Sequence, residues 1–137
     1  MVHALYTIKI LLKPGGTLID IHPSADRPEI HVRTPAGAQF AGTLEESDDF
    51  IEYGQAQAAL EQAVSDGIFN LEHQGRFAFA LHAESLVSLQ NFLAESWKDA
   101  ILSPGVIRKI EALFAGPPPG QEVVVTEQIV ISRLRRK

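Results

Sequence analysis

The N-terminal stretch carries apolar residues at helical spacing. The residues that share this stripe are Val2, Leu5, Ile8, Leu11 and Leu12. They recur every three or four positions and predict a helix over residues 2–12. The helix must end at Lys13-Pro14-Gly15-Gly16, because proline presets the first turn position and Gly15 can take the positive φ that a type II turn needs next.

The following run, Thr17 to His22, is apolar at both even and odd positions. Leu18, Ile19 and Ile21 would point to opposite faces of a strand, so the run predicts a strand covered on both sides, as in a parallel sheet. Pro23 ends it. Residues 24–47 have a different texture: an alternating segment, Ile30 to Arg33, precedes a return segment at 39–44, and the two predict a hairpin.

The rest of the chain predicts a helix, a strand, two helices and a final strand. A helix beginning near Asp49 buries a stripe of small residues and ends at Gly67. A strand candidate covers Phe69 to His82, with a break at Gln74-Gly75. Ser85 and Ser103-Pro104 begin the next two helices, and Gly116 with Pro117, Pro118 and Pro119 ends the second. The last strand runs from Glu122 to about Leu134.

Length and composition bound the class of protein. The chain has 137 residues, of which 45% are hydrophobic and 21% charged, which predicts one globular domain over residues 1–137. It contains no cysteine, which excludes disulfides and thiolate metal sites and favours a cytoplasmic location. The apolar start lacks a basic leader and a cleavage site, and no run approaches the ~20 apolar residues of a membrane span. We therefore expect no membrane partner.

The net charge argues against nucleic acid as a partner. At −5 it repels phosphate backbones. The one basic run consists of Arg133, Arg135, Arg136 and Lys137, and we interpret it as a solvated chain end.

The element order, together with two segments, resembles a known family. Leu12-Lys13-Pro14-Gly15-Gly16-Thr17-Leu18-Ile19-Asp20-Ile21 is similar to the turn and fifth strand of class I S-adenosylmethionine-dependent methyltransferases. Glu122 to Arg135 resembles that family's seventh strand, which runs antiparallel between the fifth and sixth. The resemblance implies an α/β fold: a partial Rossmann-like sheet of strands five, seven and six, with flanking helices and an inserted β-hairpin. Residues 24–47 would then form an insertion and a candidate lid.

The resemblance covers only the C-terminal half of the family's domain. The cofactor-binding N-terminal half has no counterpart here, because Gly15-Gly16 precedes its strand and no strand is followed by a glycine-rich loop and a helix. We expect no cofactor on this chain alone, and S-adenosylmethionine only with a complementing half.

The candidate site residues follow from the same resemblance. It would place His3, Tyr6 and His22 on the substrate side, near the carboxyl ends of two strands. His22 could act as a general base, or it could end a strand and hydrogen-bond a loop carbonyl. A metal site formed by Asp20, His22, Glu29 and His31 would need the hairpin to cross back over the first strand. No catalytic residue and no metal ligand is assigned.

Three functions remain open. The first is a truncated or split methyltransferase-like protein that is not catalytic alone, and whether it is an enzyme stays uncertain. The second is an interaction module that forms a homodimer, or a complex with a separately encoded N-terminal half, through residues 2–21. The third is a small metal-dependent enzyme.

Overall fold

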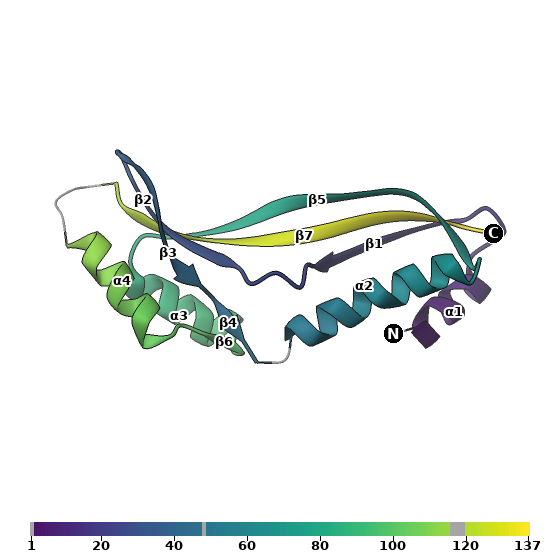
Figure 1. Ribbon diagram of the computed structural model, residues 1–137, viewed down its shortest axis with the longest axis horizontal. Coiled ribbons are helices and arrows are strands. Elements are labelled where there is room, and N and C mark those ends of the chain that lie inside the picture. Colours follow the sequence, from purple (N-terminus) through teal and green to yellow (C-terminus); the bar gives the residue numbers. More distant parts are fainter. Residues whose placement is uncertain (1, 48, 116–119) are drawn as a thin grey trace. The chain divides into compact units, whose positions relative to one another are not determined.

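The protein is an α/β chain of four helices and seven strands in the part that the structure describes. This computed structural model describes residues 2–47, 49–115 and 120–137. The turn-forming Gly116 and the three prolines that follow it therefore lie outside the described residues. The elements in chain order are α1 (Val2–Leu11), β1 (Thr17–Pro23), β2 (Glu29–Thr34), β3 (Gly37–Thr43), β4 (Glu45–Glu46), α2 (Asp49–Ser65), β5 (Phe69–Ala83), α3 (Leu86–Ser96), β6 (Ala100–Ile101), α4 (Pro104–Phe114) and β7 (Glu122–Arg136) (Figure 1).

Contacts divide the chain into two compact units. The first unit comprises Met1–Ala25, Asp48–Phe77 and Gln128–Lys137, and the second comprises Asp26–Ser47 and Ala78–Glu127. Each unit has a core of its own, described separately below. Whether the chain acts as one domain stays a prediction.

In the first unit, α1 and α2 cover one face of β1, β7 and the start of β5. β1 pairs antiparallel with β7, so that Leu18 lies opposite Leu134 and Ile21 opposite Ile131. The buried residues of this core come from α1, α2, the start of β5 and β7: Leu5, Ala59, Leu60, Ala63, Ile68, Phe69 and Leu134. The antiparallel pairing predicted between the last strand and Leu18–Ile21 is confirmed.

In the second unit, β2 joins β3 and β7, and α3 and α4 supply the other side of the core. β2 pairs antiparallel with both neighbours, with Ile30 opposite Val125 and also opposite Gly42. Ile30, Val32, Leu89, Ile110 and Val123 are fully buried there. The hairpin predicted within residues 24–47 is confirmed, and it contributes β2 and β3 to the sheet itself. Whether these residues also act as a lid stays a prediction.

The predicted fold class is wrong. We expected a partial Rossmann-like sheet with the hairpin as an insertion. The antiparallel pairing of β1 with β7 agrees with that expectation, but β2 and β3 belong to the same sheet, where β2 pairs antiparallel with both β3 and β7, and β4 pairs antiparallel with β6. The architecture is a mixed α/β arrangement with a mostly antiparallel sheet. The error came from Leu18, Ile19 and Ile21, which suggested cover on both faces. Leu18 faces the helices, while Ile19 and Ile21 are 51% and 58% exposed.

Most of the predicted turns and helix ends are confirmed, but one predicted break in a strand is wrong. Gly15 adopts a φ of 73° and Gly67 a φ of 70°, as the turn after α1 and the end of α2 require. Ser85 and Ser103 cap α3 and α4 by accepting hydrogen bonds from the amides of Ser88 and Val106. The break expected at Gln74-Gly75 is absent, since β5 continues through it.

Candidate functional site

The hydrogen-bond phase of β1 is set at its two ends. The Ser24 amide donates to the Gln128 carbonyl (2.7 Å), and the Arg136 amide donates to the Gly16 carbonyl (2.8 Å). In an antiparallel ladder, residues alternate between hydrogen-bonded and non-hydrogen-bonded positions. Residues of even number in β1 therefore direct their backbone groups toward β7, and residues of odd number direct theirs away from it.

The free edge of β1 therefore carries the outward-directed amides and carbonyls of Thr17, Ile19 and Ile21. Among the described strands, β1 pairs with β7 alone. The side chains of these three residues are also exposed. Such an edge is a template for pairing with another chain.

Of the features that usually block an edge, β1 carries one, Pro23 at its last position, and the residues before it carry none. Natural sheets protect their edges with lysine, proline, bulges or inward-pointing charges. Thr17 to His22 contains no lysine, arginine or proline, and its one charged residue, Asp20, is an even-numbered position whose carboxylate contacts His22.

Exposed apolar residues also occur on α1, which precedes this edge. Leu5 of α1 is buried and packs with Leu18, which fixes the inner face of the helix. Ile10 and Leu11 are 78% and 79% exposed. A short helix with two nearly bare aliphatic side chains is typical of a surface that a partner covers.

His22 has a partner that fixes its ring. Its Nδ1 lies 2.5 Å from Asp20 Oδ2, and its side chain is only 10% exposed. The carboxylate favours the tautomer with a proton on Nδ1, which leaves Nε2 as an acceptor. Nε2 is covered and has no partner among the described residues. A covered nitrogen cannot take a proton from a substrate, so in this conformation the pair holds β1 in place.

His3 and Tyr6 do not join His22 in one polar cluster. Both lie on α1, where the Tyr6 hydroxyl donates to Asp66 Oδ2 (3.2 Å) and the His3 carbonyl accepts from Thr7 (3.1 Å). The hydrogen bond to Asp66 raises the pKa of Tyr6. His22 instead contacts Asp20, and both of these residues lie in the C-terminal half of β1.

The two pairs considered as metal ligands form separately. Asp20 contacts His22 in the first unit, and Glu29 Oε2 lies 3.9 Å from His31 Nε2 in the second. Within the part of the chain that the structure describes, no three His, Asp or Glu side chains group as a metal site would require.

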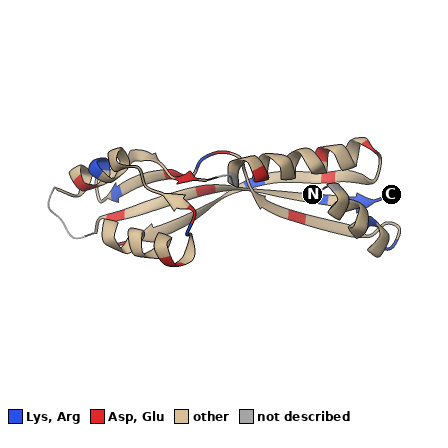
Figure 2. Ribbon diagram, turned by 90° about the horizontal axis from the view of Figure 1, so that it is seen from below, with Lys and Arg blue, Asp and Glu red and all other residues tan. Residues whose placement is uncertain are grey.

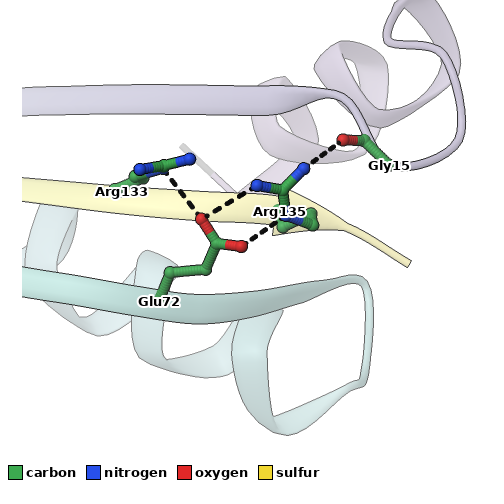
Figure 3. A network of polar contacts seen from close by, with 4 residues as sticks. All are labelled: Gly15, Glu72, Arg133 and Arg135. Carbon is green, nitrogen blue, oxygen red and sulfur yellow. Dashed lines mark hydrogen bonds and ion pairs between the residues drawn. The ribbon is translucent and has the colours of Figure 1, made fainter.

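The basic run near the C-terminus belongs to β7, and two of its arginines form ion pairs with a carboxylate of β5, so it is not a solvated chain end. Arg133 Nε lies 2.8 Å from Glu72 Oε2, and Arg135 also binds Glu72 while donating to the Gly15 carbonyl (2.8 Å) (Figure 3). The Arg135 hydrogen bond, aided by the charges of both arginines, holds the pKa of Glu72 below its ordinary value, and the same contact raises that of Arg135. Glu72 thereby links β5, β7 and the Pro-Gly-Gly turn.

The second unit contains a comparable ionic cluster on its own strands. Glu122 of β7 binds Arg33 of β2 and lies 3.1 Å from His82 Nδ1 of β5. Desolvation alone would raise the pKa of Glu122, but the hydrogen bonds from His82 and Arg33 outweigh it, so the pKa is lowered. Glu122 thus contacts both Arg33 and His82 and connects β7 with β2 and with β5.

An apolar pocket of about 330 Å³ lies between α2 and the strands of the first unit. The residues that line it are Gln57, Leu60, Glu61, Val64, Ser65, Leu71, Gln74, Ser132 and Leu134. The sequence analysis missed it. Gln57 and Ser132 are polar residues at positions that the periodicity of α2 and β7 otherwise gives to buried apolar side chains, but this pattern alone does not indicate that the two residues line one pocket.

Comparison with known proteins adds no identification. Neither the scan of protein-family models nor the search of curated protein sequences finds a match to this chain. None of the helices in the described residues has both the length and the apolar character needed to span a bilayer.

Proposed function

We propose that this chain is an interaction module that forms a homodimer through residues 2–21, with the free edge of β1 at the centre of the contact. The single observation that carries the proposal is the outward-directed backbone of Thr17, Ile19 and Ile21, on a strand that carries an edge-protecting residue only at its last position, Pro23. Pairing would satisfy these backbone groups with protein partners and remove apolar surface from water.

A second copy is the occupant favoured by symmetry. Two antiparallel copies of β1 are related by a two-fold axis, so the edge is complementary to itself. With Ile19 opposite the partner's Ile19, Thr17 lies opposite the partner's Ile21, and every outward amide meets a carbonyl. The exposed isoleucines then form cross-strand contacts on one face of the joined sheet.

The side chains around the edge support the same arrangement. Ile19 and Ile21 carry no charge that would repel an identical neighbour, and Asp20 is occupied by His22 on the helix-covered face. Ile10 and Leu11 of α1 supply further apolar surface within the proposed region. We retain a cytoplasmic location in this proposal, on the strength of the cysteine-free sequence.

The other two functions have less support. The methyltransferase prediction depended on a Rossmann-like sheet, whereas the observed sheet is mostly antiparallel and includes β2 and β3, so it stays a prediction without a structural premise. The metal-dependent enzyme would need Asp20, His22, Glu29 and His31 together, whereas the described contacts link them only in pairs.

Light scattering coupled to size-exclusion chromatography tests the proposal. The purified chain at micromolar concentration should elute with the mass of two copies. A monomeric mass across the micromolar range would contradict a homodimer. It would leave the edge to a different protein, such as a separately encoded half.

A further inference from the structure

We propose that the pocket between α2, β5 and β7 binds a small, mainly apolar molecule that carries an N–H or O–H donor and no negative charge. The inference concerns the first unit alone and does not depend on dimer formation.

The pocket is large enough for a bicyclic molecule. Its volume is about 330 Å³. An engineered cavity of about 150 Å³ with aliphatic walls binds benzene, which has six heavy atoms. A pocket of about twice that volume therefore accommodates on the order of ten heavy atoms.

The body of the ligand would contact aliphatic side chains from three elements. Leu60 and Val64 come from α2, Leu71 from β5 and Leu134 from β7. Leu60 and Leu134 are buried members of the first unit's core, which makes that part of the wall rigid. Leu71 is 44% exposed, so a ligand beside it would remove apolar surface from water.

One acceptor in the wall has an unmet hydrogen bond. Gln57 Nε2 donates to Glu61 Oε1 (2.8 Å), and a carboxylate only accepts, so this contact fixes which end of the amide is the carbonyl. Gln57 Oε1 is covered and has no donor among the described residues. A covered acceptor without a donor is unfavourable, and Gln57 lines the pocket, so a ligand N–H or O–H would supply the missing donor.

A second polar group lies on the strand side of the pocket. Ser132 of β7 is only 1% exposed, and its Oγ accepts from Gln74 Nε2 (3.0 Å). Serine and glutamine side chains at a mostly apolar wall are typical of pockets that orient a ligand through a few hydrogen bonds.

The charge of the wall selects against anions. Glu61 lines the pocket, and the lining residues include no lysine or arginine. The sequence of α2 likewise contains no basic residue, and its ribbon in Figure 2 carries acidic colour without basic colour. A carboxylate ligand would enter a negative field without a cation to pair with, so uncharged or cationic molecules are favoured.

Three indoles test these points with matched shapes. Indole has nine heavy atoms and one N–H donor, N-methylindole lacks the donor, and indole-3-carboxylate adds a negative charge. Each would be titrated into the full chain while the amide chemical shifts of Ser132 and Leu134 are followed. Indole should produce saturable shifts with a Kd below about 1 mM, and N-methylindole should bind about three- to tenfold more weakly, as expected for one lost hydrogen bond.

Variants on α2 assign the binding to the pocket. Gln57→Leu should abolish the preference for indole over N-methylindole, and Gln55→Leu, an exposed glutamine of the same helix outside the pocket, should retain it. Val64→Phe should remove binding of indole and of N-methylindole while circular dichroism shows an unchanged fold. The proposal is overturned if indole produces no saturable shift, if N-methylindole or the carboxylate binds as tightly as indole, or if Gln57→Leu retains the preference.

Discussion

Ile21 of β1 lies directly opposite Ile131 of β7, and both side chains are exposed on the sheet face that α1 and α2 leave uncovered. The two residues share a face and differ in one respect. Ile21 belongs to a strand with a free edge, whereas Ile131 belongs to the central strand. Substitutions at the edge strand and at the central strand can therefore distinguish a dimer formed by edge pairing from a dimer formed by stacking of the exposed sheet faces.

Lysine at the edge should dissociate the dimer, and lysine on the face should not. Ile19→Lys places two like charges opposite each other across the two-fold axis, and like charges directly opposite are destabilising. Light scattering should show a monomer for Ile19→Lys and a dimer for Ile131→Lys. The opposite pattern would indicate that the uncovered sheet face, and not the edge, forms the contact.

Proline substitutions should have different effects at positions whose amides point toward β7 and at positions whose amides point to the free edge of β1. At Ile19 the lost amide points away from β7, so Ile19→Pro should prevent dimerisation while the fold is retained. At Leu18 the lost amide belongs to the ladder with β7, so Leu18→Pro should cost about 1–3 kcal/mol of unfolding free energy for the carbonyl left without a donor. Urea unfolding of both variants measures the difference. Equal losses of stability would mean that the assigned hydrogen-bond phase is wrong.

The Glu72 network should contribute stability above the carboxyl's ordinary pKa of 4.5 and lose it in acid. The folded-state pKa of Glu72 is lowered by Arg135, so the unfolded chain binds the proton more readily than the folded one. The contribution is complete above the ordinary value and disappears as the pH falls through the lowered one. Thermal unfolding of the wild type and Glu72→Gln should therefore differ at pH 7, and the difference should begin to shrink near pH 4.5 and vanish at lower pH. A difference that persists unchanged in acid would contradict this.

Gly42 should resist substitution in the second unit. It adopts a φ of 147°, and an added Cβ would meet Val106 Cγ2 at 2.5 Å. Gly42→Ala should cost about 1–3 kcal/mol of unfolding free energy. Gly54→Ala is the matched control, because an added Cβ there meets nothing within 4 Å, and it should stabilise α2 by about 0.4–1 kcal/mol. A neutral Gly42→Ala in urea unfolding would show that β3 can shift away from α4.

S-adenosylmethionine should not bind the chain alone. Gly15-Gly16 lies before β1 and not after a strand, so no glycine loop can approach a nucleotide at a strand's carboxyl end. Isothermal titration should show no heat of binding. Micromolar affinity would restore the methyltransferase prediction despite the antiparallel sheet.

The sequence predicted local elements well because their signals are local. The Pro-Gly-Gly turn, the serine caps and the alternation within residues 30–44 each depend on a few neighbouring residues. The direction of strand pairing depends instead on contacts between distant segments. An apolar run such as Leu18 to Ile21 has the same composition whether both faces are covered or one face is bare.

The pocket could not be predicted from the sequence for a similar reason. Gln57 and Ser132 lie 75 positions apart, and only the packing of α2 against β7 brings both to one wall. The arginines were misassigned because a basic run at a chain end resembles a solvated tail. Arg133 and Arg135 occupy alternate positions of a strand, and a carboxylate on the neighbouring strand binds both.

Residue-resolved amide exchange tests the proposed interface most directly. At concentrations where light scattering finds a dimer, the amides of Thr17, Ile19 and Ile21 should be protected, and dilution to monomer should release them while Leu18 stays protected by β7. Fast exchange at Ile19 in the dimeric sample would contradict the account, since an edge that forms the contact cannot leave its central amide open to water.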